Sequence, residues 1–325
     1  MTAPTFGAGY TQWVGQAPET VYGTAQSVPT YWTPADSPKY VPNLKMLVDG
    51  ALRGSQAAEF GQIPGMRYDS LTYKTYFYLD SVFLFMRQLL GGTDVPTGAG
   101  PYTHTTSLQN TGNNGQPTGT TLFFNAFDKT WQMPGAILQE AKITLKSEEL
   151  ATIELTYWGL PATAITAPTN TPTTAVAMPT WNTTITLAGS ATNRYSELDL
   201  DYKRETKAID VINGTQAPGA IFAGPVTVSG SLTAVFAGST DVDWVNYLTN
   251  VQPTLVSKTA PVGDAVNFIQ FALSKVGYDQ ASFEAGADYY EIKSNIRGIA
   301  NSTDAIGGGL SPSKVTLTSS VSTAI

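Results

Sequence analysis

Residues 71–77 and 81–90 change from strand-like to helix-like hydrophobic spacing within a short distance. Over 71–77 every second side chain is apolar or Thr, which is typical of a strand with one buried face. The apolar side chains that follow recur at helical spacing. The pattern therefore predicts a helix over 81–90, with Asp80 or Ser81 as its cap and Gly91 at its end.

The same change recurs in residues 226–236 and 241–249. Alternating apolar residues predict a strand over 226–236, and helical spacing predicts a helix over 241–249. Thr240, with Asp243 three residues later, has the form of a capping box, and Asn250 is suited to end the helix.

These two stretches correspond residue by residue at one constant spacing along the chain. The corresponding pairs are Tyr73 and Leu232, Phe77 and Phe236, Phe85 and Trp244, Met86 and Val245, and Leu89 and Leu248. Downstream, 121–124 corresponds to 266–269, and 152–157 corresponds to 289–294. The sequence thus predicts a duplicated unit of strand, helix and further strands. Each helix is expected to pack on its own sheet through the following residues: Phe85, Met86 and Leu89 in the first, and Trp244, Val245 and Leu248 in the second.

The 325 residues are long enough for two cores, and two mainly β domains are expected. The predicted division is an extended arm over 1–43, a first domain over 44–160, a Thr- and Pro-rich linker over 161–180, a second domain over 181–302, and an extension over 303–325. Further strands are expected at 44–48, 121–127, 139–145 and 150–158. Residues 92–119 are expected to be loop, and 314–321 could add a strand to a neighbouring sheet.

A long Gly-containing loop is expected after the first strand of each domain, over Asp49–Gly65 and Lys203–Gly224. Long loops at the same place in both copies favour a functional role.

The chain is acidic, with 18 Lys and Arg against 25 Asp and Glu and a net charge of −7. Both halves share this balance, which disfavours ordinary nucleic-acid binding, because that needs Lys and Arg to neutralise phosphates. There is no Cys, which excludes disulfides, thiolate metal sites and a cysteine nucleophile. No secretory signal or membrane span is recognised at the sequence level, so a soluble protein made in the cytoplasm is expected.

Residues suited to catalysis are few. His104 is the only histidine, so a Ser-His-Asp triad would need it, and a structural role is expected instead. The adjacent pair Glu148-Glu149 is expected to be solvated and not a glycosidase pair. Asp199 and Asp201 share one strand face and could bind calcium, although solvent or an interface is the expected environment. Aromatic residues over 73–85 could form a sugar platform, but their periodicity favours packing. No catalytic, cofactor or metal residues are predicted.

Several short motifs occur in a familiar order: Glu19-x-x-Tyr22-Gly23-Thr24, Gly50-Ala-Leu-Arg-Gly54, the strand and helix of 71–90, Pro101-Tyr-Thr-His104, and Leu155-Thr-Tyr-Trp-Gly159. Taken together over nearly the whole chain, they resemble the major tail protein, or tail tube protein, of long-tailed non-contractile bacteriophages.

This resemblance implies a β-sandwich or partial barrel with a flanking helix, whose sheets join between subunits into a β-barrel lining a tube. The protein would be a virion component without enzymatic activity or cofactors, and viral DNA would pass through stacked rings of it. Its other partners would be tail proteins such as the tape measure and the tail terminator, and no membrane would be involved. The inter-ring contacts would fall on the long loops, at Asp49, Arg53, Glu59, Lys203, Arg204 and Lys207.

The duplication departs from the single tube domain of many family members, and it implies three chains in a pseudo-hexameric ring. One domain could instead decorate the outside of the tube. A β-rich host-binding or carbohydrate-binding virion protein is the alternative function, and a β-sandwich hydrolase is a third. For a tube, we expect the channel wall to be acidic or neutral, so that DNA slides without being held.

Overall fold

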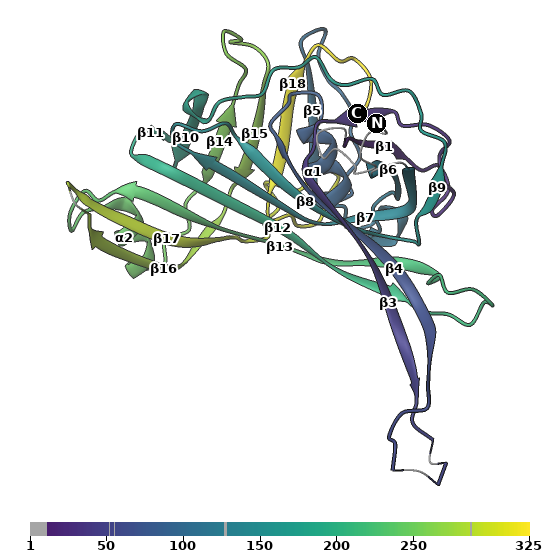
Figure 1. The fold of residues 1–325 in the computed structure, drawn as a ribbon. Coiled ribbons are helices and arrows are strands. Elements are labelled where there is room, and N and C mark those ends of the chain that lie inside the picture. The colour runs from purple at the N-terminus through teal and green to yellow at the C-terminus, as the bar shows by residue number, and fades with distance from the viewer. Residues whose placement is uncertain (1–11, 52, 55, 127–128, 287) are drawn as a thin grey trace, which may run out of the picture.

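The computed structural model describes residues 12–51, 53–54, 56–126, 129–286 and 288–325 (Figure 1). The start of the predicted arm, Leu52 of the Gly50–Gly54 run and Phe127 at a predicted strand end lie outside these residues. Two antiparallel sheets and two short helices, α1 (Val82–Leu90) and α2 (Val242–Thr249), make up the fold. The prediction of a mainly β protein is confirmed.

The larger sheet has twelve strands. They are β1 (Val14–Pro18), β2 (Tyr31–Thr33), β3 (Asp36–Asp49), β4 (Gly61–Tyr76), β6 (Thr120–Ala126), β7 (Lys129–Lys146), β8 (Thr152–Gly159), β9 (Thr163–Ile165), β12 (Tyr195–Ile209), β13 (Ala220–Val235), β16 (Val276–Ala285) and β17 (Tyr290–Gly298). One long run of eight strands follows the order β3-β4-β8-β7-β12-β13-β17-β16. The expected arm therefore already holds β1, β2 and the first part of β3, and β9 and a 3₁₀ turn (Thr180–Asn182) lie in or next to the expected linker.

The two halves of the chain meet where β7 pairs with β12. Lys146 lies opposite Glu197 and Glu140 lies opposite Lys203, with unbroken register between them. Side chains from both halves enter one large buried cluster, which includes Leu71 and Leu155 from the first half and Leu232 from the second. The expected two cores are thus largely merged into one, because the sheet continues across the junction.

Irregularities in pairing occur at corresponding places in the two halves. In the first strand of each hairpin, the pairing with the second strand shifts register at a corresponding place. The shift lies between Leu44 and Met46 in β3, and between Arg204 and Thr206 in β12. The strands at the other end of each half shift likewise: between Leu138 and Glu140 in β7, and between Tyr278 and Gln280 in β16. A bulge bends its strand, so both halves bend at equivalent positions.

The second sheet has six strands in the order β11-β10-β14-β15-β18-β5. They are β5 (Tyr102–Ser107), β10 (Thr183–Leu187), β11 (Ser190–Thr192), β14 (Leu255–Thr259), β15 (Phe268–Leu273) and β18 (Lys314–Ser319). One prediction is wrong here, because the expected loop 92–119 contains β5 and a 3₁₀ turn (Gly112–Gly115). The extended segment expected at 314–321 forms β18, which adds to this sheet between β15 and β5 of its own chain. Because the buried side chains of β5 are His104, Thr106 and Ser107, hydrophobic alternation could not reveal it.

Helix α1 lies in the interior of the molecule between the two sheets (Figure 1). Phe85, Met86 and Leu89 are fully buried, as predicted for this helix. Ser81 stands at the N-cap without a side-chain capping bond, whereas Gly91 takes the left-handed conformation (φ 76°) and donates its N–H to Arg87 O at 2.7 Å. Such a positive φ explains why glycine stands at this helix end.

Helix α2 does not present the face that the sequence predicts. Val245 is 38% exposed and Leu248 61% exposed, so these two residues are not core residues of the single chain. Its buried residues are the polar Asp243 and Asn246. Asp243 accepts hydrogen bonds from the hydroxyls of Tyr195 (3.0 Å) and Tyr278 (2.7 Å), and it forms an ion pair with Arg194. This polar network holds the hydrophilic side of the helix inward and turns the apolar side out.

The cap of α2 also differs from the expected Thr240–Asp243 box. Asp241 is the N-cap, and its carboxylate accepts the backbone N–H groups of Asp243 (3.0 Å) and Trp244 (3.5 Å). Trp244 is half-buried and packs its ring against Phe283 of β16 at a centroid distance of 5.4 Å. Trp244 is therefore the one predicted core residue of α2 that contacts its own sheet.

Candidate functional site

The candidate site is extended: one open sheet face, two unpaired strand edges and two hairpins. The helices and the second sheet cover only one face of the long strand run, and the other face is open (Figure 1). Along β12, Leu198, Leu200 and Tyr202 are buried in the core. Alternation therefore directs Asp199 and Asp201 to the open face.

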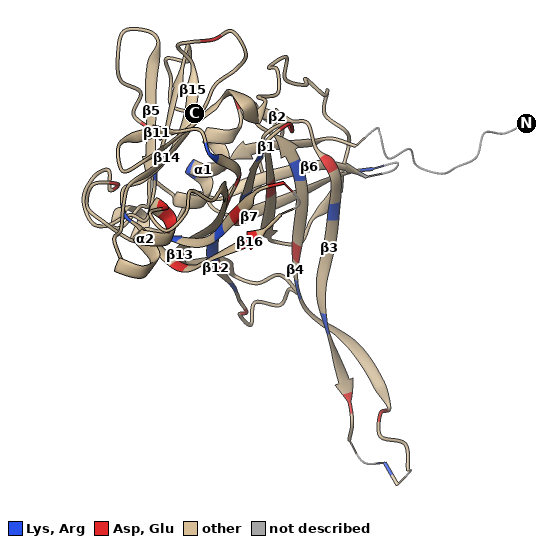
Figure 2. Ribbon diagram, turned by 90° about the vertical axis from the view of Figure 1, so that its left-hand side faces the viewer, with Lys and Arg blue, Asp and Glu red and all other residues tan. Residues whose placement is uncertain are grey.

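Charges of both signs alternate across this open face at the β7–β12 junction. Lys142 lies opposite Asp201, Glu140 opposite Lys203, and Lys146 opposite Glu197. Directly opposed unlike charges contribute about 0.2–1 kcal/mol each. Figure 2 shows blue and red residues interspersed over these strands without a continuous stretch of one sign. The face is therefore close to balanced in charge and does not form a basic phosphate-binding surface.

The suggested calcium site at Asp199 and Asp201 gains no further ligands. Asp199 accepts a long hydrogen bond from the Ser231 hydroxyl (3.4 Å). No group of three or more His, Cys, Asp or Glu suited to a metal ion occurs among the described residues.

Strands β3 and β16 form the two ends of the long run. In the described part of the chain, β3 pairs only with β4, and β16 pairs only with β17. Each therefore has a row of backbone N–H and C=O groups without a strand partner. Unprotected edges of this kind template pairing with another chain.

The β3–β4 hairpin projects far from the body of the molecule (Figures 1 and 2). Asp49 ends β3, and its carboxylate forms an ion pair with Arg53 near the tip. The Arg53 guanidinium also lies over the Phe60 ring at 5.1 Å, while Glu59 is exposed. These contacts hold the Arg53 side chain against Asp49 and Phe60. Asp49, Arg53 and Glu59 thus lie together at the far end of the hairpin.

The β12–β13 hairpin projects less far than the β3–β4 hairpin (Figure 1). Most of the expected loop 203–224 belongs to its two strands. Lys203 and Lys207 are exposed on β12, and the loop proper covers 210–219. This loop contacts the first hairpin: the Arg67 N–H donates to Gln216 O at 2.8 Å, and the Gln216 amide donates to Pro64 O at 3.3 Å. The tip of the second hairpin therefore packs against β4 of the first.

Arg204 is not a loop residue and is not available for an inter-ring contact, so this prediction is wrong. Its side chain is buried, and its guanidinium donates to Leu89 O (2.8 Å) and Leu90 O (3.3 Å) at the end of α1. Burial lowers the pKa of Arg204 to about 10. A cation at the C-terminal end of a helix satisfies carbonyls that have no partner within the helix. Arg204 therefore links the second half of the chain to the helix of the first.

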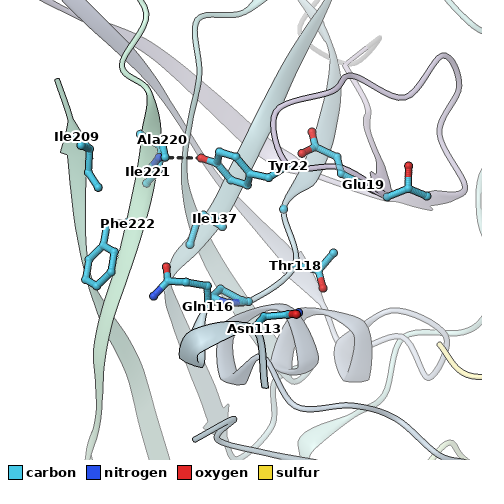
Figure 3. Close-up of a pocket in the computed structure, with 13 residues that line it drawn as sticks. Glu19, Tyr22, Asn113, Gln116, Thr118, Ile137, Ile209, Ala220, Ile221 and Phe222 are labelled. Carbon is cyan, nitrogen blue, oxygen red and sulfur yellow. Dashed lines mark hydrogen bonds between the residues drawn. The ribbon is translucent and has the colours of Figure 1, made fainter. Parts of the chain in front are cut away.

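The Glu19–Thr24 motif forms a clamp between the arm and the β12–β13 hairpin (Figure 3). The Tyr22 hydroxyl accepts the Ile221 N–H (2.7 Å) and donates to Gly135 O (3.1 Å). Burial raises the pKa of Tyr22 to about 12. Glu19 accepts the Thr121 hydroxyl at 2.8 Å and the Gly135 N–H at 2.7 Å. Glu19, Tyr22 and Ile221 line a pocket of about 460 Å³, and the polar groups of Glu19 and Tyr22 are occupied by these structural bonds.

His104 is structural. Its Nδ1 lies 2.8 Å from the Asp94 carboxylate and its Nε2 lies 2.9 Å from Val321 O, and Asp94 also accepts the Ile325 N–H at 2.9 Å. Neither ring nitrogen is free to accept a proton from a nucleophile. The arrangement ties the C-terminal segment to β5, and it provides no triad.

The other suggested chemical sites are structural as well. Glu148 occupies a turn with a positive φ of 69°, and Glu149 faces Lys146 at 3.8 Å. Tyr73 and Tyr157 stack in the core with ring centroids 6.2 Å apart, so these aromatic rings are not displayed as a sugar platform. No helix in the described part of the chain is long and apolar enough to cross a membrane.

Comparison with known families adds one finding. A family model described as phage tail tube protein matches residues 13–318, which is nearly the whole chain. A comparison with curated proteins gives no match.

Proposed function

Because the chain belongs to the phage tail tube protein family, and is therefore a structural, non-enzymatic protein of the virion tail, we propose that three copies close into one ring of a siphophage-type tube. Each chain supplies two tube domains, over 44–160 and 181–302. The rings stack into the conduit through which DNA leaves the virion.

The repeated strand order carries this proposal. The first half contributes β3-β4-β8-β7, and the second half contributes β12-β13-β17-β16 in the same sequence order. The bulges of β3 and β12 correspond, as do those of β7 and β16. Two copies of one unit, joined end to end, account for both regularities.

The β7–β12 junction within the chain is the template for the junction between chains. If each half is one unit, β16 is the counterpart of β7 and β3 is the counterpart of β12. The edge β16 of one chain would then pair with the edge β3 of the next. This is a head-to-tail interface, which closes into a ring when the rotation per unit permits. Three chains would bring six units to the ring and leave neither the β3 edge nor the β16 edge unpaired.

The register follows from the bulges. Glu140, the first residue after the β7 bulge, lies opposite Lys203, the residue before Arg204. The counterparts are Gln280 and Asn43. Continuing along the strands, Phe283 would lie opposite Tyr40 on the core face, and Glu284 opposite Lys39 on the open face. Unlike charges therefore meet at the proposed junction, as they do at β7–β12.

In such a ring the open face would line the channel. Its interspersed charges give DNA few places where counterion release could hold the phosphates, so the duplex would pass without specific binding. The projecting tip with Asp49, Arg53 and Glu59 would reach the adjacent ring, with Lys203 and Lys207 as further candidates. The tape measure and tail terminator are the other partners we propose. A second domain that only decorates the tube would leave β16 and β3 unpaired, so we favour two tube domains.

Electron microscopy and mass photometry of the purified protein test the proposal. Rings with three-fold symmetry and three times the 34.6 kDa chain mass are expected, alone or stacked into tubes. Monomers under all assembly conditions would overturn the ring, and rings of six chains would overturn the two-domain arrangement. A monomer that binds glycans or host cells would instead support the alternative, a β-rich host- or carbohydrate-binding virion protein.

A further inference from the structure

The apolar side of α2 lies open where the same side of α1 is buried. Val245 and Leu248 are 38% and 61% exposed, and Val251 just beyond the helix is 50% exposed, whereas Met86 and Leu89 at the corresponding places in α1 are fully buried. The difference arises because α1 has the second half of its own chain beside it. In the described residues, α2 contacts mainly β16 and β17 and has no corresponding neighbour on its far side.

The second half covers the end of α1 through one side chain of β12. Arg204, the last residue before the β12 bulge, donates to the carbonyls of Leu89 and Leu90. The residue in the same place before the β3 bulge is Leu44. Leu44 is 41% exposed, and it belongs to the strand that ends the long run on the other side of the molecule.

We propose that Leu44 of the next chain in the ring seats against the C-terminal end of α2, on the apolar surface formed by Val245, Leu248 and Val251. The occupant of this surface is thus a second copy of the same chain. The inference rests on the proposed ring. It goes further by proposing that Leu44 of the next chain plays at α2 the part that Arg204 plays at α1.

The chemistry of the two helix ends agrees with this exchange of Arg for Leu. At the end of α2, the backbone N–H of Asn250 donates to the Tyr247 carbonyl (3.5 Å) and that of Val251 to the Asn246 carbonyl (3.1 Å), and the Thr249 hydroxyl donates to Val245 O (2.7 Å). Asn250 is left-handed, with φ 53°. Local bonds thus satisfy the carbonyls of Val245, Asn246 and Tyr247, whereas Arg204 bonds the carbonyls of Leu89 and Leu90 in α1. An apolar side chain fits α2, because Val245, Leu248 and Val251 form an apolar surface at this end of the helix.

The rest of the junction supports the same placement. Phe283, which is 47% exposed, stacks on Phe236 and contacts Trp244 of α2, so the core face of β16 continues into the apolar surface of the helix. Tyr40 and Leu44 share the core face of β3 because they lie four residues apart on one strand. A chain that pairs through Tyr40 and Phe283 would therefore carry Leu44 toward α2.

Cysteine crosslinking in this cysteine-free chain tests the contact. The variant carries Leu44→Cys with Leu248→Cys, and it is oxidised after assembly. We expect crosslinked species of two and three chains, with no larger covalent species from single rings. The matched control carries Leu47→Cys with Leu248→Cys. Leu47 is also exposed on β3 but lies roughly 10 Å further along the strand. That distance exceeds the reach of a disulfide, so little crosslinking is expected.

A second variant, Leu44→Asp, tests the same contact without relying on disulfide formation. We expect it to fold as a soluble monomer and to lose at least ten-fold in the extent of ring formation, while Leu47→Asp keeps most of it. Tubes that form normally with Leu44→Asp, or a 44–248 pair that does not crosslink in intact tubes, would overturn the seating of Leu44 and leave the ring intact. A wild-type protein that never forms rings would overturn the proposed function itself.

Discussion

Substitution of equivalent positions in the two helices, Met86→Asp and Val245→Asp, should have opposite consequences. Met86 is fully buried between the sheets. Loss of its burial costs about 1.5–3 kcal/mol. Placing a carboxyl group in the same apolar site adds several kcal/mol, whether it stays charged or takes up a proton. The sum, about 5 kcal/mol or more, equals much of the typical stability of a domain, about 5–15 kcal/mol. We therefore expect insoluble Met86→Asp protein.

Val245 is partly exposed, so an Asp side chain there reaches water. The cost is a partial loss of apolar burial, about 1 kcal/mol. Val245→Asp should therefore stay folded and soluble as a monomer. Because the substitution places a charge on the surface that we assign to the next chain, ring formation should be lost.

Solubility, circular dichroism and urea denaturation measure the first effect, and mass photometry measures the second. Met86→Leu is the matched control for the core, since a swap of similar volume costs less than about 1.5 kcal/mol. Folded, soluble Met86→Asp protein would show that the α1 surface is not core. Unfolded Val245→Asp protein would show that the α2 surface belongs to the core of the single chain.

Four further outcomes are expected. Arg204→Met should lower the free energy of unfolding in urea by about 1–3 kcal/mol, because the Leu89 carbonyl loses its Arg204 donor and the Leu90 carbonyl keeps only the Gln109 N–H, and Arg204→Lys should recover part of it. Burial raises the pKa of Tyr22 to about 12, so its contribution to stability is complete below pH 10 and is lost as the pH rises through 12; Tyr22→Phe should remove this alkaline loss from a stability–pH profile. Replacing residues 50–60 by a short turn should leave rings that no longer stack in micrographs. Intact tubes should not retard DNA in a gel at low salt, whereas tight binding would refute a channel wall of balanced charge.

The sequence allowed the alternating strand and the following helix to be located closely, because their side chains are apolar at regular spacing. The helix expected at 81–90 is α1, Val82–Leu90, and its predicted core residues Phe85, Met86 and Leu89 are buried. A helix or strand whose buried side is apolar can be recognised without knowledge of its partners.

Elements that depend on polar burial could not be found in this way. In β5, His104 and Thr106 are buried because β18 and the C-terminal segment supply their partners from the far end of the chain. Arg204 falls in a stretch of exposed residues, and nothing local indicates that it reaches the end of α1. In α2, the side chosen by hydrophobicity was the open one, because a network around Asp243 holds the polar side inward. The sequence did carry a signal for this arrangement: two acidic residues, Asp241 and Asp243, stand at the start of a helix that follows Arg194-Tyr195 along the chain.

The prolines of β3 distinguish the proposed β16–β3 junction between chains from the β7–β12 junction within the chain. β3 contains Pro38 and Pro42, which have no N–H to donate, whereas β12 contains no proline. Proline on an edge strand weakens uncontrolled pairing with other chains. The proposed junction between chains would then hold fewer backbone hydrogen bonds than β7–β12, and it would depend more on side chains such as Leu44, Tyr40 and Phe283. Such a junction is weak in a single contact and becomes stable when all the edges of a ring are joined at once, which favours closed rings over open chains.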